Sequence, residues 1–222
     1  MAMWIRTLAA VALIALTSGC ATSRSVVSLD QPSSSSTNPE RGVAIKIIKV
    51  TDARVFEAAP KNPDTPSLSS DDMPNSSIKV RAIGRKRSGF GMALGDVLLP
   101  EGQTVSDMMA SALADGFRQP NYRVLTQGEA GYDTAIPIKA QVIQFWSWFQ
   151  PGFWEVQVHN RSEVEITGTL HELSKGLTVQ GAADESMMAV TESDWQEISS
   201  LGLKNFSENL VKALASKSQN NE

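Results

Sequence analysis

Residues 133–173 read DTAIPIKAQVIQFWSWFQPGFWEVQVHNRSEVEITGTLHEL and have the strongest strand pattern of the chain. This stretch predicts two long antiparallel strands, 133–149 and 153–173, because a Gln-Pro-Gly turn signal separates two runs that favour strands. The second run alternates, with one face made of Trp154, Val156, Val158, Val164, Ile166 and Leu170 and the other of Glu155, Gln157, His159, Arg161, Glu163 and Glu165. One apolar face with a period of two predicts a half-buried strand of an antiparallel sheet.

Shorter segments around this hairpin add strands to the same sheet. Residues 43–50, VAIKIIKV, are rich in β-branched side chains and predict a strand. Shorter strands are expected at 78–83 and 122–125, and residues 177–182 extend the meander.

Two segments have the periodicity of amphipathic helices. The first, 104–119, begins with Thr104 and Asp107 at capping-box spacing and ends before Pro120. The second begins at Ser193, with Gln196 three residues later. Their apolar faces consist of Val105, Met108, Met109, Ala112, Leu113 and Phe117, and of Trp195, Ile198, Leu203, Phe206, Leu210 and Leu214. The predicted class is therefore α+β, an antiparallel sheet with a long hairpin and two amphipathic helices packed on one face.

The N-terminus has the composition of an export signal. Arg6 precedes the apolar run Leu8–Leu16, which is too short to cross a bilayer core of ~30 Å. Residues 16–20, LTSGC, resemble the lipobox of bacterial lipoproteins. That resemblance implies cleavage after Gly19, a diacylglyceryl thioether on Cys20 and acylation of the new amino terminus.

These features predict the organisation of the chain. Residues 1–19 are the signal peptide, and 20–40 are the lipidated Cys20 with a flexible Ser-rich tether. Residues 41–217 form one α+β domain that includes a Pro/Ser-rich loop insertion at 57–77, and 218–222 are a tail. By the same resemblance to lipoproteins, Ala21 stands where a retained inner-membrane protein has aspartate, so the expected location is the periplasmic face of the outer membrane.

The charged and glycine-rich residues are candidate ligand sites. A formal net charge of −4 offers no electrostatic basis for binding nucleic acid. Gly84 and Gly89 have phosphate-loop spacing, but Phe90 follows where that motif needs Lys. The remaining alternatives for Arg85, Lys86 and Arg87 are contact with an anion or solvated charges on a flexible loop.

No motif in the sequence points to catalysis. His159 and His171 are twelve residues apart on an extended strand, too far to share a metal, and no GxSxG motif occurs. A lipidated Cys20 supplies no thiolate. We therefore predict no catalytic residue, no metal and no cofactor, and a protein that is not an enzyme.

Aromatic side chains gather around the turn of the long hairpin. Trp146 and Trp148 share one face of their strand, and Phe145 and Phe149 occupy the other, so both faces are apolar. One face is free for the helices, whereas the other needs a cover: the 57–77 insertion, the 84–95 segment, a partner or lipid headgroups. Dense exposed aromatics mark interaction surfaces. The candidate surface consists of Phe90, Trp146, Trp148, Phe149, Phe153 and Trp154, and the alternative is that the protein covers them itself.

Three blocks of the chain resemble the YajG-like bacterial lipoproteins. They are VAIKIIKVTDAR from residue 43, IGRKRSGFGMALGDVLLPEGQTVSDMMASALADGFRQPNYRVL from residue 83, and FWSWFQPGFWEVQV from residue 145. The resemblance implies a cell-envelope lipoprotein and supplies no catalytic positions. The expected function is that of a membrane-anchored, non-enzymatic protein that binds another envelope component. The alternatives are an auxiliary lipoprotein of a transporter or assembly machine, and a small-ligand or lipid carrier.

Overall fold

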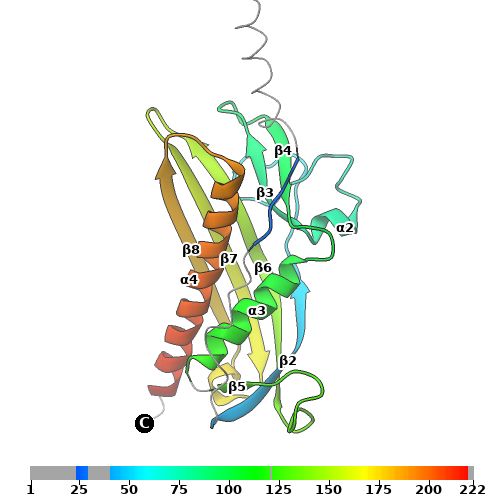
Figure 1. Ribbon diagram of the computed structural model, residues 1–222, viewed down its shortest axis with the longest axis vertical. Helices are drawn as coiled ribbons and strands as arrows, with labels where there is room; N and C mark the ends of the chain where they lie inside the picture. Colours follow the sequence, from blue (N-terminus) through cyan, green and yellow to red (C-terminus); the bar gives the residue numbers. More distant parts are fainter. Residues whose placement is uncertain (1–23, 30–40, 121, 220–222) are drawn as a thin grey trace, which may run out of the picture.

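The computed structural model describes residues 24–29, 41–120 and 122–219, which fold into one mixed sheet with the two long helices on one side (Figure 1). The expected signal peptide, Cys20, most of the tether and the last three residues lie outside this range. The strands are β1 (Ser25–Val26), β2 (Val43–Asp52), β3 (Ala82–Arg87), β4 (Ala93–Leu98), β5 (Tyr122–Val124), β6 (Ile136–Pro151), β7 (Val156–Gly168) and β8 (Leu177–Met187). The helices are α2 (Ser76–Lys79), α3 (Val105–Arg118), α4 (Glu192–Gln219) and a short 3-10 turn, His171–Leu173.

The long hairpin predicted from the sequence is the centre of the sheet. β6 and β7 pair antiparallel from Ile138 opposite Gly168 to Pro151 opposite Val156, and β8 continues the meander beyond β7. The other edge of β6 is long enough to pair with two strands, one after the other. β2 pairs with the first half of β6, and β3 meets its second half at Ser147.

The α+β class and the helix-covered face are confirmed, and the pairing adds a parallel component. β2 pairs parallel with both β5 and β6, β3 pairs parallel with β6, and β1 pairs parallel with β4. The order along this part of the sheet is β1-β4-β3-β6-β2-β5. Parallel neighbours require long connections, and here α3 and the 57–77 insertion lie in those connections.

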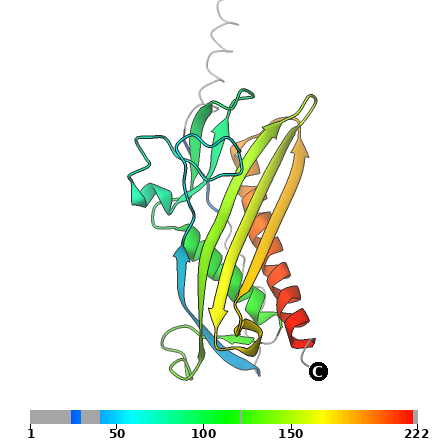
Figure 2. The same cartoon turned by 180° about the vertical axis from the view of Figure 1, so that it is seen from behind.

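Helices α3 and α4 cover one face of the sheet and contact each other (Figures 1 and 2). The apolar faces predicted for both helices are buried, including Phe117 of α3 and Phe206 of α4. Phe145 of β6 lies in the same core. α4 begins at Glu192, one residue before the predicted start, and Thr191 contacts Asp194 in place of the expected Ser193–Gln196 pair.

A glycine allows α4 to approach the sheet closely. A Cβ atom built on Gly202 would lie 2.0 Å from Oδ1 of Asn160 on β7. Beside it, Ser199 of α4 and Ser147 of β6 join their hydroxyls at 2.8 Å, and Asn160 Nδ2 donates to Ser147 Oγ at 2.8 Å. Asn160 and Ser162 are therefore buried. They lie on the same face of β7 as the apolar residues of the predicted alternation, such as Val158 and Val164.

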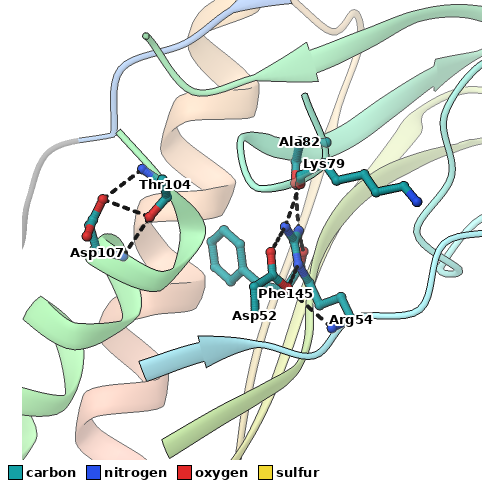
Figure 3. A network of polar contacts seen from close by, with 7 residues as sticks. All are labelled: Asp52, Arg54, Lys79, Ala82, Thr104, Asp107 and Phe145. Carbon is teal, nitrogen blue, oxygen red and sulfur yellow. Dashed lines mark hydrogen bonds and ion pairs between the residues drawn. The ribbon is translucent and has the colours of Figure 1, made fainter. Parts of the chain in front are cut away.

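The predicted capping box of α3 is present (Figure 3). Asp107 N donates to Thr104 Oγ1 at 3.2 Å, and Thr104 N donates to Asp107 Oδ2 at 3.1 Å. These bonds satisfy amide groups that have no partner inside the helix.

Replacing Thr104 with Ala is expected to lower the free energy of unfolding by about 1 kcal/mol, the usual loss for an N-cap hydroxyl. The measurement is urea denaturation followed by far-UV circular dichroism. Thr104→Ser is the control because it keeps the hydroxyl, and it should stay near wild type. An equal loss in both variants would mean that the methyl group, and not the cap, stabilises this helix start.

Arg54, just before the 57–77 insertion, is bound to the sheet by an ion pair and hydrogen bonds (Figure 3). Its side chain is fully buried and forms a two-pronged contact with Asp52, with Nη2 to Oδ2 at 2.7 Å and Nε to Oδ1 at 2.8 Å. Its remaining donors reach three carbonyl oxygens, those of Ala82 at 2.6 Å, Phe145 at 3.0 Å and Lys79 at 2.9 Å. One guanidinium thus joins β2, the end of α2, β3 and β6.

Three boundary predictions were wrong. Residues 24–29 were assigned to the flexible tether, but β1 pairs with β4, and Ser25, Val27 and Leu29 are buried. Residues 78–83 were expected to form a strand, but Ile78 lies in α2 and the strand begins at Ala82. The expected tail is also shorter, because α4 continues to Gln219.

Candidate binding surface

The aromatic residues of β6 are divided between two cores, as their alternation predicts. Phe145 is buried on the helix side, and Phe149 packs there against Trp195 with ring centroids 5.7 Å apart. Trp146 and Trp148 point to the opposite face and form a second apolar cluster.

The 57–77 insertion covers that second cluster. Leu68 is fully buried against the two tryptophans, and the ring of Phe56 meets Trp146 edge-on with centroids 5.9 Å apart. Placing Trp146, Trp148 and Phe149 on an exposed interaction surface was therefore wrong. The protein covers them itself: the insertion, whose composition suggested an irregular loop, covers Trp146 and Trp148, and Phe149 packs against Trp195 of α4 on the other face.

The basic residues of β3 serve the fold as well. Gly84–Gly95 is an antiparallel hairpin of β3 and β4 and not a flexible loop. Arg85 and Lys86 are buried, Arg85 lies 3.5 Å from the Asp96 carboxylate, and Lys86 Nζ donates to Ser25 Oγ at 2.6 Å. Arg87 donates to Ser67 Oγ at 2.9 Å. Neither alternative, contact with an external anion or solvated charge on a flexible loop, describes the observed contacts, because groups within the protein contact all three side chains.

The first described residues are held tightly against β4 and its neighbours. Arg24 Nη2 lies 2.5 Å from Asp72 and 3.3 Å from Asp96. Ser25 Oγ donates to Glu192 at 2.5 Å, and Val27 N donates to the carbonyl of Leu98 at 2.9 Å. Residues 24–29 are therefore part of the fold.

The exposed aromatic and methionine side chains of the described residues gather at one end of the domain, whereas the other exposed large apolar side chains are aliphatic: Val26, Val43, Ile48 and Val55. The exposed fractions are 94 % for Phe90, 88 % for Phe153, 80 % for Trp154, 85 % for Met188 and 62 % for Met92. We call these residues the hairpin end. Phe90 and Met92 belong to the β3–β4 connection, Phe153 and Trp154 to the β6–β7 connection, and Met188 follows β8.

The strand directions place these connections together. β3 runs parallel to β6, so the two hairpins turn at the same end of the sheet (Figure 1). Met187 pairs with Val156, which brings Met188 beside the β6–β7 turn. Of the candidate surface, Phe90, Phe153 and Trp154 are therefore exposed and lie at one end.

A charged cluster lies on the sheet face away from the helices. The ring of His159 stacks on Trp148 with centroids 5.0 Å apart, and its Nδ1 lies 2.5 Å from Asp184 Oδ1. Arg161 also contacts Asp184, at 2.7 Å, and lies over the Trp148 ring. Partial burial raises the pKa of Asp184, but the hydrogen bonds from His159 and Arg161 and the Arg161 charge outweigh it, so the pKa is lowered.

This lowered pKa predicts a pH dependence of stability. The contribution of Asp184 is fully present above the unfolded-state pKa of about 3.9 and is lost as the pH falls through the lower folded-state pKa. Denaturation at about pH 6 and about pH 3 should therefore show a smaller stability loss in Asp184→Asn than in wild type. Asp133→Asn, at an exposed site outside this cluster, is the control. An identical pH dependence in wild type and Asp184→Asn would contradict the assignment.

The two histidines do not come together in the structure. His171 lies in the 3-10 turn after β7, apart from His159, and no group of three or more His, Cys, Asp or Glu residues within the described ranges is arranged to hold a metal. A cavity of about 440 Å³ lies between α3 and the segment after β5. Its lining mixes apolar side chains with the Asp115–Arg118 ion pair. None of the helices in the described part of the chain has the length and apolar character needed to cross a bilayer.

Comparison with known proteins gives similarities of fold only. No protein-family model matches the sequence, and no curated protein matches it. A solved structure of an uncharacterized protein is similar with a TM-score of 0.44 and 8% identity, over 86% of this chain and 97% of the other. A Xanthomonas campestris protein of the DUF330 family has a TM-score of 0.41 and 11% identity, over 89% and 96%. A neuraminyllactose-binding hemagglutinin homolog from Helicobacter pylori has a TM-score of 0.27 and 8% identity, over 87% and 95%.

These values assign no family. The resemblance to the YajG-like lipoproteins stays a prediction.

Proposed function

We propose that this chain is a lipid-anchored protein of the bacterial cell envelope that acts by binding and not by catalysis. The hairpin end is its contact surface. The observation that carries the proposal is the gathering of Phe90, Phe153, Trp154 and two methionines, all exposed, at one end of a domain whose other large aromatics are covered. An apolar surface of this kind is characteristic of interaction sites.

The anchor in this proposal is Cys20, within the lipobox-like LTSGC sequence. Ala21 directly after it favours the periplasmic face of the outer membrane, and the resemblance to YajG-like lipoproteins supports the same compartment. More than one acyl chain on Cys20 gives stable attachment, because burial of each CH₂ group contributes ~0.8 kcal/mol.

The alternative functions differ in what the hairpin end contacts. An auxiliary lipoprotein of a transporter or assembly machine would use it to bind one protein. A carrier of small ligands or lipids would need an apolar cavity between the sheet and the helices. The 440 Å³ cavity instead has an ion pair, Asp115–Arg118, in its lining, which favours the binding module over the lipid carrier.

Photo-crosslinking in cells tests the proposal. A photo-reactive amino acid replaces Phe153 or Phe90, and adducts are identified by mass spectrometry. The control places the same probe at Val43, which is 49 % exposed and lies at the start of β2, at the opposite end of the sheet. All three sites are exposed, so the substitutions should leave the fold unchanged.

The expected result is one class of adduct, a protein or a lipid, that forms at both hairpin-end sites and is missing at Val43. Equal or absent labelling at the three sites would overturn the hairpin end as a contact surface. A chain that is not lipidated would overturn the anchor.

A further inference from the structure

We infer that the hairpin end rests on the membrane leaflet that holds the lipid anchor, so that its contact is the lipid surface itself. The inference rests on the proposed lipidation of Cys20. The direction and the length of the chain between Cys20 and the fold indicate that the hairpin end contacts lipid.

The direction of the chain follows from the pairing of β1. β1 is parallel to β4, with Ser25 opposite Val97 and Val26 opposite Leu98. Going back along the chain from Ser25 therefore follows β4 back toward its own start at Ala93, and that start adjoins the turn that carries Phe90. Figure 1 shows β1 and the β3–β4 hairpin side by side, with the hairpin turns at the upper end. The anchor thus precedes the fold on the hairpin-end side.

The length of chain matches the distance to that end. Five residues separate Ser25 from Cys20, and five separate Val97 from Met92. At roughly 3.3 Å per extended residue, each segment spans about 16 Å. Cys20 therefore reaches the level of Met92 when the intervening chain is fully extended. Any less extended path brings the leaflet closer to the hairpin end.

The polar contacts of β1 keep it attached to the domain, so the connection between Cys20 and the fold cannot easily become longer. Arg24 pairs with Asp72 and Asp96, and Ser25 accepts from Lys86 and donates to Glu192. Releasing β1 would break these contacts and expose Val27 and Leu29, both buried. The distance between the domain and the leaflet is therefore set by residues 20–24 and not by a long leash.

The side chains at this end suit a lipid headgroup layer. Phe153 and Trp154 pack edge to face with centroids 4.7 Å apart, and both remain exposed. Tryptophan is enriched at membrane–water interfaces, because its ring is apolar and its N–H is polar. Methionine, at Met92 and Met188, adds flexible apolar surface. Apolar side chains that enter the boundary between headgroups and acyl chains strengthen the attachment of a protein that is already anchored.

Quenching of tryptophan fluorescence by brominated lipid tests the inference. The lipidated full mature chain is reconstituted into vesicles of phosphatidylethanolamine and phosphatidylglycerol, with a fraction brominated near the headgroup end of the acyl chain. Trp154 is the reporter, since Trp146, Trp148 and Trp195 are all buried. We expect strong quenching in the wild type and loss of most of it in Trp154→Phe. Near-UV circular dichroism of the variant checks the fold.

The outcomes separate this inference from the proposed function. The mass of the N-terminal peptide of the same sample shows whether Cys20 carries lipid. Lipidated protein on the vesicles with no Trp154-dependent quenching would overturn the membrane contact and leave the anchored binding module standing. A protein adduct at Phe153 in the cell would do the same and favour a protein partner. An unlipidated chain would overturn both.

Discussion

Replacing Arg54 with Ala is expected to lower the free energy of unfolding by about 3–5 kcal/mol, the range measured when one partner of a buried ion pair is removed. Arg54 is fully buried, and its removal leaves the Asp52 carboxylate without its ion-pair partner. The carbonyls of Lys79, Ala82 and Phe145 also lose a donor. Unsatisfied buried acceptors are costly because they have given up their contact with water.

The measurement is urea denaturation of Arg54→Ala, with Arg41→Ala as the matched control. Arg41 is exposed, so its loss should change stability by less than about 0.5 kcal/mol. Arg54→Lys keeps the charge but lacks the planar fork, and it should fall between wild type and Arg54→Ala. A loss in Arg54→Ala as small as that in Arg41→Ala would show that this network does not hold the insertion to the sheet.

Replacing Trp146 with Ala should have an effect of similar size, a loss of about 3–5 kcal/mol. The ring is fully buried between the sheet and the 57–77 insertion, in contact with Phe56. Its removal leaves a cavity in the cluster that covers the second face of the sheet. The insertion should then open, so limited proteolysis should cut within 57–77 before the rest of the domain.

Trp146→Phe is the matched control for this variant. Nε1 of Trp146 is buried and finds no hydrogen-bond partner among the described residues, so losing this N–H removes an unsatisfied polar group. Trp146→Phe should therefore cost much less than Trp146→Ala. Equal losses in the two variants, or no change in proteolysis of the insertion, would contradict the assignment of 57–77 as a packed cover.

The elements that the sequence predicted well are those with a strong local signal. The β6–β7 hairpin followed from the alternation of its second strand and from the Gln150-Pro151-Gly152 turn signal, and α3 followed from its 3.6-residue period and its capping box. Both depend on residues that are near neighbours in the chain. The opposite orientations of Trp146 and Phe145 on β6 followed from the same local geometry.

The predictions that failed concern contacts between distant segments. β1 is only two residues long and is held by β4, some seventy residues away, although the alternation of Ser25, Val27 and Leu29 is a signal that could have revealed it. Composition suggested an irregular insertion at 57–77, yet the single buried Leu68 and its neighbours suffice to cover two tryptophans. Arg85 and Lys86 looked like surface charges because their partners, Asp96 and Ser25, come from other strands.

The sequence located the aromatic cluster of the candidate surface, but it could not show which of these side chains are buried and which are exposed. Trp148 and Trp154 are six residues apart and chemically the same, yet the first is buried beside His159 and the second is exposed beyond the end of β6. Strand length and the position of the insertion decide between them, and both are set by tertiary pairing. Met188 joins the hairpin end only because β8 pairs with β7 up to Met187.

The proposed lipid anchor is best tested by the mass of the N-terminal peptide of the mature chain, isolated from the membrane fraction of a bacterium that expresses the full sequence. We expect a peptide that begins at Cys20 and carries a diacylglyceryl group and an amide-linked acyl chain, and a Cys20→Ser variant that is no longer processed. A mature chain that begins at another residue, or that begins at Cys20 without lipid, would show that this protein is not anchored through Cys20.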